Sequence, residues 1–286
     1  MSKVLIIVPM YNVENYIKKM LDSIQNQTFK NFRCVLIDDG STDNTKNIIK
    51  PYLKDNRFEY YFQENGGPGK ARNHGLDLMD SEDYVYIPDS DDELSLDLLE
   101  ECVKIFDSRE DADIVYFGFR VITRFGPASA KRVTATKKGP LLLRGKKKAQ
   151  FDGAGAWGYM IRSTLIRNNK IRFNTTLKMH EDYIFAYEVA EAAKEICIIP
   201  SILYNWNNLR EDSLTATWCT QSGFLVKDEF DQFLKNWIDK YPDSDIIDRV
   251  KADYTAETSI SAKFSWRPMQ LLTKYEDYNI INSCLK

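Results

Sequence analysis

Short apolar runs alternate with stretches of helical periodicity over the first ninety residues of the chain. Each run has the length of a strand and the aliphatic or aromatic character of strands buried in a parallel sheet. Each periodic stretch has an apolar residue every three or four positions, as in a helix with one buried face. The runs lie at residues 3–8, 32–37, 58–62 and 84–87, and the periodic stretches at 12–27, 45–53 and 70–79. This alternation predicts right-handed βαβ units, and so an α/β fold with a mainly parallel sheet flanked by helices.

The loops after the four predicted strands carry most of the chemistry of this half. Because parallel strands end at the same edge of a sheet, these loops should meet in space although they lie far apart in the chain. Open α/β sheets bind their ligands at that edge. The loops contain Pro9-Met10-Tyr11, Asp38-Asp39, Gly66-Gly67-Pro68-Gly69 and Asp89-Ser90-Asp91. Asn12, just after the first loop, is the predicted N-cap of the first helix.

The last of these loops is part of a segment with four acidic residues within five positions, 89–93. Pro88 cannot extend a strand ladder, so Asp89 and Asp91 should lie in the loop itself. Their oxygens suit Mg²⁺ or Mn²⁺, and Mg²⁺ is usually held by one or two carboxylates together with substrate phosphates. The other interpretation is the acidic start of the helix predicted over 95–106, where Asp92 would cap the helix. The loop taken alone leaves both open.

The second half of the chain has weaker patterns. Strands are expected over 113–119 and 196–203, and a loop or sheet edge over 151–162. Residues 120–148 carry ten Lys and Arg and no acidic residue. We expect irregular structure or short hairpins in this basic segment, which is either solvated or in contact with an anionic acceptor or membrane surface. From about residue 221 onward the pattern is amphipathic and helical.

A second acidic pair, Glu181-Asp182, begins a helical pattern directly after His180. Acidic residues stabilise helix N-termini, so Asp182 is either a cap or a functional carboxylate. His180 has no second histidine at ligand spacing and is expected to be a packing or hydrogen-bonding residue.

Composition narrows the function classes. With 43% hydrophobic and 28% charged residues the chain is an ordinary globular protein, and its net charge of -3 argues against a nucleic-acid partner. The five cysteines are scattered without a CxxC pair, which argues against a disulfide framework and a zinc site. No apolar run approaches the ~20 residues that span a bilayer. We therefore expect a cytoplasmic protein with at most peripheral contact to the inner face of a membrane.

The ordered motifs resemble those of family 2 glycosyltransferases, which use nucleotide sugars and have the Rossmann-like GT-A fold. The resemblance is specific over the nucleotide-binding half and weaker beyond residue 150, where it continues at Glu181-Asp182 and at 204–210. The motifs are Pro9-Met10-Tyr11-Asn12, Asp38-Asp39-Gly40-Ser41-Thr42-Asp43, Gly67-Pro68-Gly69-Lys70-Ala71-Arg72-Asn73 and Asp89-Ser90-Asp91-Asp92.

The resemblance implies a role for each donor-site residue. Tyr11 would pack on the nucleotide base, and Asp39 would accept a hydrogen bond from it. Gly67 would let the backbone approach the nucleotide, and Arg72 would offer its guanidinium to the phosphates or base. The implied nucleotide-sugar-binding residues are Pro9, Tyr11, Asp39, Gly67, Arg72, Asp89 and Ser90.

The resemblance also implies a metal, a base and an acceptor site. Asp91, together with Asp89, would ligate the Mg²⁺ or Mn²⁺ that bridges the diphosphate, and Asp89 would also contact ribose. Asp182 would be the general base that deprotonates the acceptor hydroxyl, with Glu181 as the alternative. The candidates for the acceptor subsite, each of which could equally be a packing residue, are Trp157, Trp206 and Arg210.

The implied function is inverting transfer of a sugar from a nucleoside-diphosphate sugar, expected to be a UDP-sugar, to a sugar or lipid-linked saccharide acceptor. The expected process is synthesis of a bacterial surface polysaccharide. The implied GT-A domain covers 1–218, with a nucleotide-sugar half at 1–110 and an acceptor half at 111–218, and a helical C-terminal extension covers 219–286. Two alternatives remain: a non-catalytic nucleotide-sugar binding protein and a sugar nucleotidyltransferase, although the latter would need a glycine-rich basic loop after the first strand.

Overall fold

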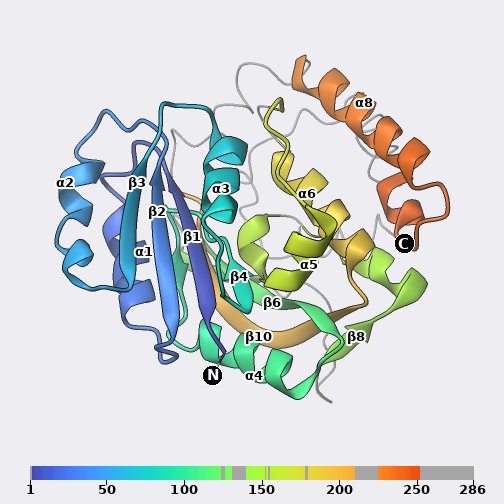
Figure 1. Ribbon diagram of the computed structural model, residues 1–286, viewed down its shortest axis with the longest axis horizontal. Helices are drawn as coiled ribbons and strands as arrows, with labels where there is room; N and C mark the ends of the chain where they lie inside the picture. Colours follow the sequence, from blue (N-terminus) through green and yellow to red (C-terminus); the bar gives the residue numbers. More distant parts are fainter. Residues whose placement is uncertain are drawn as a thin grey trace.

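A computed structural model of the chain describes residues 2–123, 126–130, 140–151, 153, 155–177, 180–209 and 225–251. The strands of these residues form one mixed sheet, with helices on both of its faces (Figure 1). The strand order is β3-β2-β1-β4-β9-β6-β10-β5, with β7 paired to β6 and β8 paired to β10.

The N-terminal half is the predicted series of parallel βαβ units. The strands β1, β2, β3 and β4 are parallel wherever they pair, and β1 lies between β2 and β4. The elements are β1 (Val4–Met10), α1 (Ile17–Gln25), β2 (Phe32–Asp38), α2 (Thr45–Ile49), η1 (Tyr52–Lys54), β3 (Phe58–Phe62), α3 (Pro68–Asp77) and β4 (Tyr84–Tyr86).

Two helix boundaries of this half differ from the prediction. The first helix begins at Ile17, and Asn12 is not its N-cap, because Asn12 has a left-handed backbone and its side-chain Oδ1 accepts a hydrogen bond from the Thr42 amide. The helix predicted over 45–53 is divided into α2 and η1 at Pro51, which lacks the N–H that a continuous helix would need.

The second half of the chain adds both parallel and antiparallel strands to the sheet. The 151–162 segment was predicted to be a loop or sheet edge, and this is wrong for its last residues. They form β9, a short buried strand between β4 and β6 and antiparallel to both. The elements are β5 (Glu93–Leu94), α4 (Leu98–Ser108), β6 (Ala112–Thr123), β7 (Gly126–Ala130), β8 (Leu141–Leu143), η2 (Gly145–Gln150), η3 (Ala156–Gly158), β9 (Tyr159–Arg162), α5 (Ser163–Asn169), α6 (Glu181–Ala192), β10 (Glu195–Asn207) and α8 (Leu225–Lys240).

Strand β1 contributes to a separate hydrophobic core on each face of the sheet. Val4, Ile6 and Val8 lie in a cluster with buried residues of α1, α2 and α4. Leu5 and Ile7 lie in a second cluster with residues of α3, α5, α6 and α8. Side chains that alternate along a strand point to opposite faces, so a continuous apolar run fits this doubly covered position.

Part of the basic segment is built into the fold. Lys148 is buried, and its Nζ donates to the carbonyl oxygens of Glu191 and Ala193 at the C-terminal end of α6. Arg144 pairs with the buried Glu195 and with Asp111. These two cations are therefore structural, whereas the side chains of residues 123–139 lie outside the described part of the chain.

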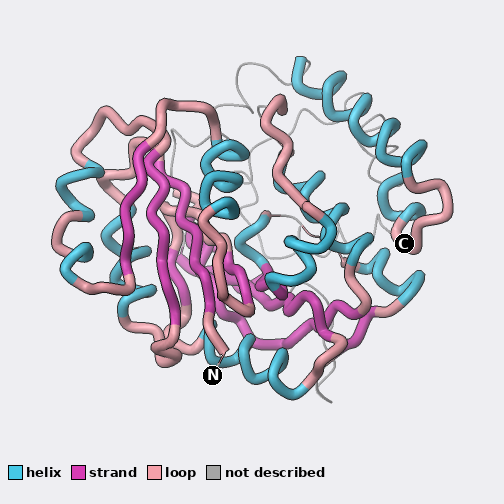
Figure 2. The backbone as a smooth tube through the Cα atoms, viewed as in Figure 1, coloured by secondary structure: helices cyan, strands magenta, loops and turns pink. Residues whose placement is uncertain are grey.

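The described part of the C-terminal region packs onto the α6 side of the sheet. Phe230, Leu234 and Trp237 of α8 are buried in the same cluster as α6 (Figure 2 shows the path of the chain). The domain boundaries given above remain predictions. Among the described helices, none has both the length and the apolar character needed to cross a bilayer.

We predict that Gly75→Ala lowers the free energy of unfolding. An added Cβ would lie 2.2 Å from Cγ2 of Ile7, where α3 meets β1. Overpacking costs about 1–3 kcal/mol and outweighs the roughly 0.5–1 kcal/mol gained from helix propensity. Urea unfolding measures the difference. The control is Gly66→Ala, whose Cβ would meet only the flexible end of Lys70, and equal stability of the two variants would contradict the prediction.

Candidate functional site

Three strand-end loops are joined by Asp39, through its backbone amide and its carboxylate. The Asp39 amide donates to the Met10 carbonyl at 2.8 Å, which ties the loop after β2 to the end of β1. The Asp39 carboxylate accepts from the amides of Gly66 and Gly67 at 2.9 and 2.8 Å, and from the Gln63 side chain at 2.7 Å. The structure therefore confirms the convergence of these loops, beside a Tyr11 side chain that is 46% exposed.

Gly67 sets the direction in which α3 leaves the glycine-rich loop. Its φ of 87° is in the left-handed region, which glycine adopts without steric cost. An added Cβ would meet nothing within 4 Å, so the residue is needed for its backbone conformation and not for lack of space. Pro68 follows at the first position of the helix, where its missing N–H has no consequence.

Helix α3 carries Arg72, which joins the acidic loop to the second acidic pair. The Arg72 guanidinium is buried, and its two terminal nitrogens lie 2.9 Å from Asp89 Oδ1 and 2.5 Å from Glu181 Oε1. Its Nε is buried and has no hydrogen-bond partner among the described residues. Arg72 thus connects carboxylates that are 92 positions apart in the sequence, from Asp89 to Glu181.

The same helix docks the segment that leads to Glu181. The Asn73 side chain exchanges two hydrogen bonds of 2.9 Å with the backbone N–H and C=O of Phe173. At Gly69 an added Cβ would lie 2.4 Å from the carbonyl oxygen of Asn174, so the two backbones are in close approach. The glycine-rich motif therefore also holds the segment that leads to Glu181.

Asp182 is a half-buried carboxylate with a raised pKa. Burial raises the pKa of Asp182 to about 7, and the charges of Glu181 and Asp89 act in the same direction. The Arg72 charge and the Tyr183 amide, which donates to Asp182 Oδ1 at 2.9 Å, oppose this rise in pKa. A pKa near the working pH is the optimum for a general base.

Asp92 does not cap a helix as the sequence suggested. It is buried, and its carboxylate accepts from the Tyr204 hydroxyl at 2.5 Å and from the Asn207 amide at 2.6 Å, both on β10. The following helix begins only at Leu98, after Asp97. Burial raises the pKa of Asp92 well above its ordinary value, and the charges of Asp91 and Asp89 raise it further. Asp92 therefore anchors the acidic loop to β10.

The acidic loop provides the ligand chemistry for a divalent cation. Among the described residues no group of three or more His, Cys, Asp or Glu side chains could hold a metal ion. Mg²⁺ needs only one or two carboxylates when substrate phosphates complete its coordination. The negative charge that Asp89 and Asp91 place beside Asp92 is the kind of environment that a cation stabilises. Their residue types thus fit the predicted Mg²⁺ or Mn²⁺.

The aromatic residues predicted for the acceptor subsite form one stack with Tyr204. The ring of Trp157 lies 4.6 Å from that of Tyr204, nearly parallel, and 6.3 Å from that of Trp206. Trp157 is buried, whereas Trp206 is half-buried. Arg210 lies outside the described residues. The acceptor roles remain predictions, and so do the donor-binding, metal-binding and catalytic roles given above.

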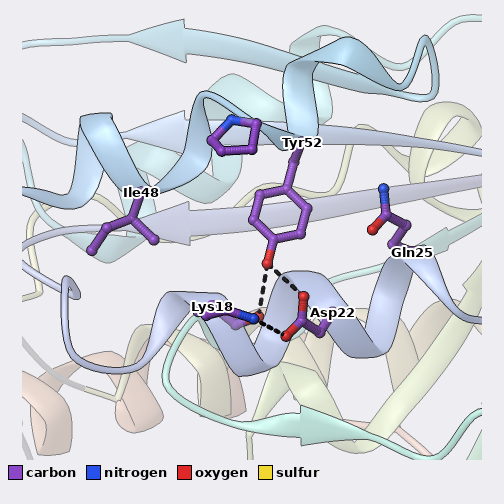
Figure 3. Close-up of a pocket in the computed structure, with 6 residues that line it drawn as sticks. Lys18, Asp22, Gln25, Ile48 and Tyr52 are labelled. Atoms are coloured by element: carbon purple, nitrogen blue, oxygen red, sulfur yellow. Dashed lines mark hydrogen bonds and ion pairs between the residues drawn. The ribbon is translucent and has the colours of Figure 1, made fainter.

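A hollow of about 410 Å³ between α1 and the α2–η1 region contains none of these residues (Figure 3). The Tyr52 hydroxyl donates to Asp22 at 2.6 Å, and Asp22 pairs with Lys18 at 2.6 Å. These polar groups satisfy one another, so the hollow presents no converging set of ligands.

The model of the family described as Glycosyl transferase family 2 matches residues 5–167, which is more than half of the chain. The chain belongs to this family.

Two curated glycosyltransferases are similar in sequence to this family 2 chain. Glycosyltransferase GlyA of Streptococcus pneumoniae is 33% identical over 227 residues, which are 76% of this chain and 32% of GlyA. Poly(ribitol-phosphate) beta-N-acetylglucosaminyltransferase TarS of Staphylococcus aureus is 31% identical over 219 residues, which are 74% of this chain and 36% of TarS. The chain spans about a third of the length of these two relatives.

Solved structures confirm the predicted GT-A fold. The crystal structure of S. aureus TarS 1–349 in complex with UDP-GlcNAc has a TM-score of 0.74 at 22% identity, covering 96% of this chain and 77% of that one. Mannosyltransferase PcManGT from Pyrobaculum calidifontis, in complex with GDP-Man and Mn²⁺, has a TM-score of 0.62 at 15% identity. It covers 99% of this chain and 81% of that one.

Sequence reasoning missed three residues that hold the family 2 site together. Tyr204 lies in a stretch that the resemblance singled out, but its contact with Asp92 could not be read from the pattern. Asn73 is the last residue of the glycine-rich motif, and its docking role was not foreseen. Gln63 links Asp39 to His74, and no sequence signal marks it.

We predict that Arg72→Gln destabilises the fold by about 3–5 kcal/mol, because breaking a buried ion pair leaves an uncompensated charge. The charge in question is the Glu181 carboxylate, whose side chain is 8% exposed. Urea unfolding of Arg72→Gln, Glu181→Gln and the double variant measures their coupling. The double variant should be more stable than Arg72→Gln alone, and strictly additive losses would contradict the pair.

Proposed function

We propose that the chain is a metal-dependent, inverting glycosyltransferase that moves a sugar from a UDP-sugar to an acceptor hydroxyl during synthesis of a teichoic acid or related surface polysaccharide. One observation carries the proposal: Arg72 bridges Asp89 of the acidic loop to Glu181, directly beside the high-pKa carboxylate of Asp182. Family membership supports the reaction class, and the similarity to TarS and to its UDP-GlcNAc complex supports the donor and acceptor classes.

In this proposal Asp182, and not Glu181, is the base. The Glu181 carboxylate is buried and paired with Arg72, which occupies one of its oxygens. Asp182 is half-buried and has a pKa of about 7. It can therefore accept a proton at neutral pH, and a substrate can reach it.

The donor residues bind and orient the nucleotide sugar. The exposed Tyr11 ring offers a face to the base beside Asp39, whose carboxylate already orders the glycine-rich loop. The Arg72 Nε–H is buried and has no hydrogen-bond partner among the described residues. An anionic group of the nucleotide sugar would accept a hydrogen bond from it. Asp91 and Asp89 would hold Mg²⁺ or Mn²⁺, which when bound stabilises the negative charge of the departing diphosphate.

The transfer is a single displacement. The acceptor hydroxyl gives its proton to the Asp182 carboxylate while its oxygen bonds to the anomeric carbon of the donor sugar. The bond from that carbon to the diphosphate oxygen breaks, and the nucleoside diphosphate leaves with the bonding electron pair. One displacement inverts the anomeric configuration.

The first test is donor binding. A ligand at 100 times its dissociation constant stabilises the fold by about 2.7 kcal/mol, so a matching UDP-sugar with Mn²⁺ should raise the melting temperature. We expect Asp91→Ala to lose the Mn²⁺-dependent part of this shift, because a phosphate-bridging ion would lose a carboxylate ligand. Glu93→Ala, which removes an exposed carboxylate two positions away, is the matched control and should keep the shift.

The outcomes of this test separate the candidate functions. Absence of a shift with every nucleotide sugar would reject the proposal. A shift without transfer to any saccharide or polyol-phosphate acceptor would favour the non-catalytic binding protein. Release of pyrophosphate from a nucleoside triphosphate and a sugar phosphate would instead identify a nucleotidyltransferase.

The second test is the pH dependence of transfer. A base works only when ionised, so kcat/KM should rise with pH and level off above about 7. Asp182→Asn should lower kcat by roughly 10² to 10⁴. Glu181→Gln should keep measurable turnover and move the acid limb to lower pH, because it removes a charge that raises the Asp182 pKa. A larger loss in Glu181→Gln than in Asp182→Asn would reverse the assignment of the base.

A further inference from the structure

The turn that leads into Glu181 and Asp182 has a backbone conformation that needs support. His180, immediately before them, has a φ of 65° in the left-handed region, although it is not a glycine. Such a conformation is strained and persists only where its surroundings hold it. His180 occupies the N-cap position of α6 and makes no side-chain capping hydrogen bond.

Helix α8 supplies part of this support. The His180 ring lies 4.7 Å from the ring of Phe230 and 5.7 Å from the ring of Tyr183. Burial lowers the pKa of His180 to about 4, so its ring is neutral at physiological pH. His180 therefore acts as an uncharged aromatic packing group between the start of α6 and α8.

Other contacts fix α8 against α6 independently of Phe230. The ring of Trp237 lies 6.0 Å from that of Tyr187. Beyond it, Lys240 and the Tyr241 hydroxyl both reach the Glu188 carboxylate, at 3.2 and 2.9 Å. In Figure 1, α8 lies at the outer edge of the molecule, beyond α6. These contacts make α8 a fixed support from which Phe230 reaches back to the first turn of α6.

We propose that Phe230 of α8 is a positioning residue for the transfer reaction, because it holds His180 in its left-handed conformation and thereby directs Glu181 toward Arg72 and Asp182 toward the acceptor. This inference rests on the proposed function. If Phe230 has this role, α8 supports the reaction as well as covering the hydrophobic core.

The geometry ties the conformation of His180 to the two carboxylates. The first hydrogen bond of α6 runs from the Ile184 amide to the His180 carbonyl at 3.2 Å. A change of the His180 backbone would break this bond and rotate the turn that carries Glu181 and Asp182. The body of α6 is held separately, since Phe185 stacks on Phe173 at 3.8 Å. Loss of Phe230 should therefore disturb the first turn and spare the rest of the helix.

The test compares Phe230→Ala with Trp237→Ala, a matched control on the same helix. Both side chains are buried, but Trp237 contacts Tyr187 in the body of α6. We measure kcat, the donor KM, the kcat/KM–pH profile and hydrogen exchange of the Ile184 amide. Phe230→Leu keeps apolar volume beside His180 and serves as the conservative variant if Phe230→Ala does not fold.

Misplacement of a reacting group by about 1 Å costs up to about 100-fold, so Phe230→Ala should lower kcat by roughly 10- to 100-fold. The donor KM should stay within about 2-fold, because Arg72 keeps its separate ion pair with Asp89 when Glu181 moves. The Ile184 amide should exchange faster, and water entering around Asp182 should lower its pKa and move the acid limb to lower pH. Phe230→Leu should recover most of the loss, and Trp237→Ala should lose stability with little change in kcat.

Equal losses of kcat in Phe230→Ala and Trp237→Ala, or wild-type exchange at Ile184 in Phe230→Ala, would overturn the proposal. A wild-type protein that transfers no sugar would defeat the proposed function but not this test. In that case faster exchange at Ile184 in Phe230→Ala alone would support the hold of α8 on the turn, and unchanged exchange would reject it.

Discussion

The buried guanidinium of Arg72 is the interaction on which the organisation of the site depends. It lies on α3 and bridges Asp89, at the end of β4, to Glu181, at the start of α6. Taking ions out of water is costly, and such a bridge adds little net stability compared with an apolar core. Its value is positional, because a rigid planar fork fixes two carboxylates from different halves of the chain. The acidic loop and the start of α6 are thereby held in one geometry.

The described residues around this bridge carry more negative than positive charge. One cation faces Asp89 and Glu181, while Asp182 and the acidic loop add further carboxylates nearby. The excess is accommodated by raised pKa values at Asp182 and Asp92. A carboxyl group whose folded pKa exceeds its unfolded value loses stability as pH rises from the unfolded pKa to the folded one. At neutral pH the folded state is therefore less stable than it would be with apolar residues at these positions. The burial and neighbouring charges that cause this loss are also what keep the pKa of Asp182 near 7.

Much of the N-terminal half could be predicted from the sequence because its signals are local. A buried parallel strand needs a continuous apolar run, and each strand end is marked by glycine, proline or aspartate. The positions of β1 to β4 and the convergence of their loops follow from these rules. The position of β9 could not be predicted this way, because a strand of four residues, three of them buried, beside glycines reads equally well as a loop. Likewise, the buried Lys148 looked like part of a solvated basic segment, since its role depends on carbonyl groups at the far end of α6.

The contacts of the site residues also depend on positions far apart in the chain, and so they could not be predicted from local patterns. Residue types and order make Asp89, Asp91, Asp182 and Arg72 candidates, but they do not say what each one contacts. Whether Asp92 caps a helix or anchors a loop depends on Tyr204 and Asn207, more than a hundred positions later. The choice between Glu181 and Asp182 depends on which of them faces Arg72, and neighbouring positions in a helix point about 100° apart. The chain enters this first turn through the left-handed backbone of His180, which sets the direction of both side chains. On the function proposed above, the last residue before the acidic pair thus decides which carboxylate pairs with Arg72 and which one would act as the base.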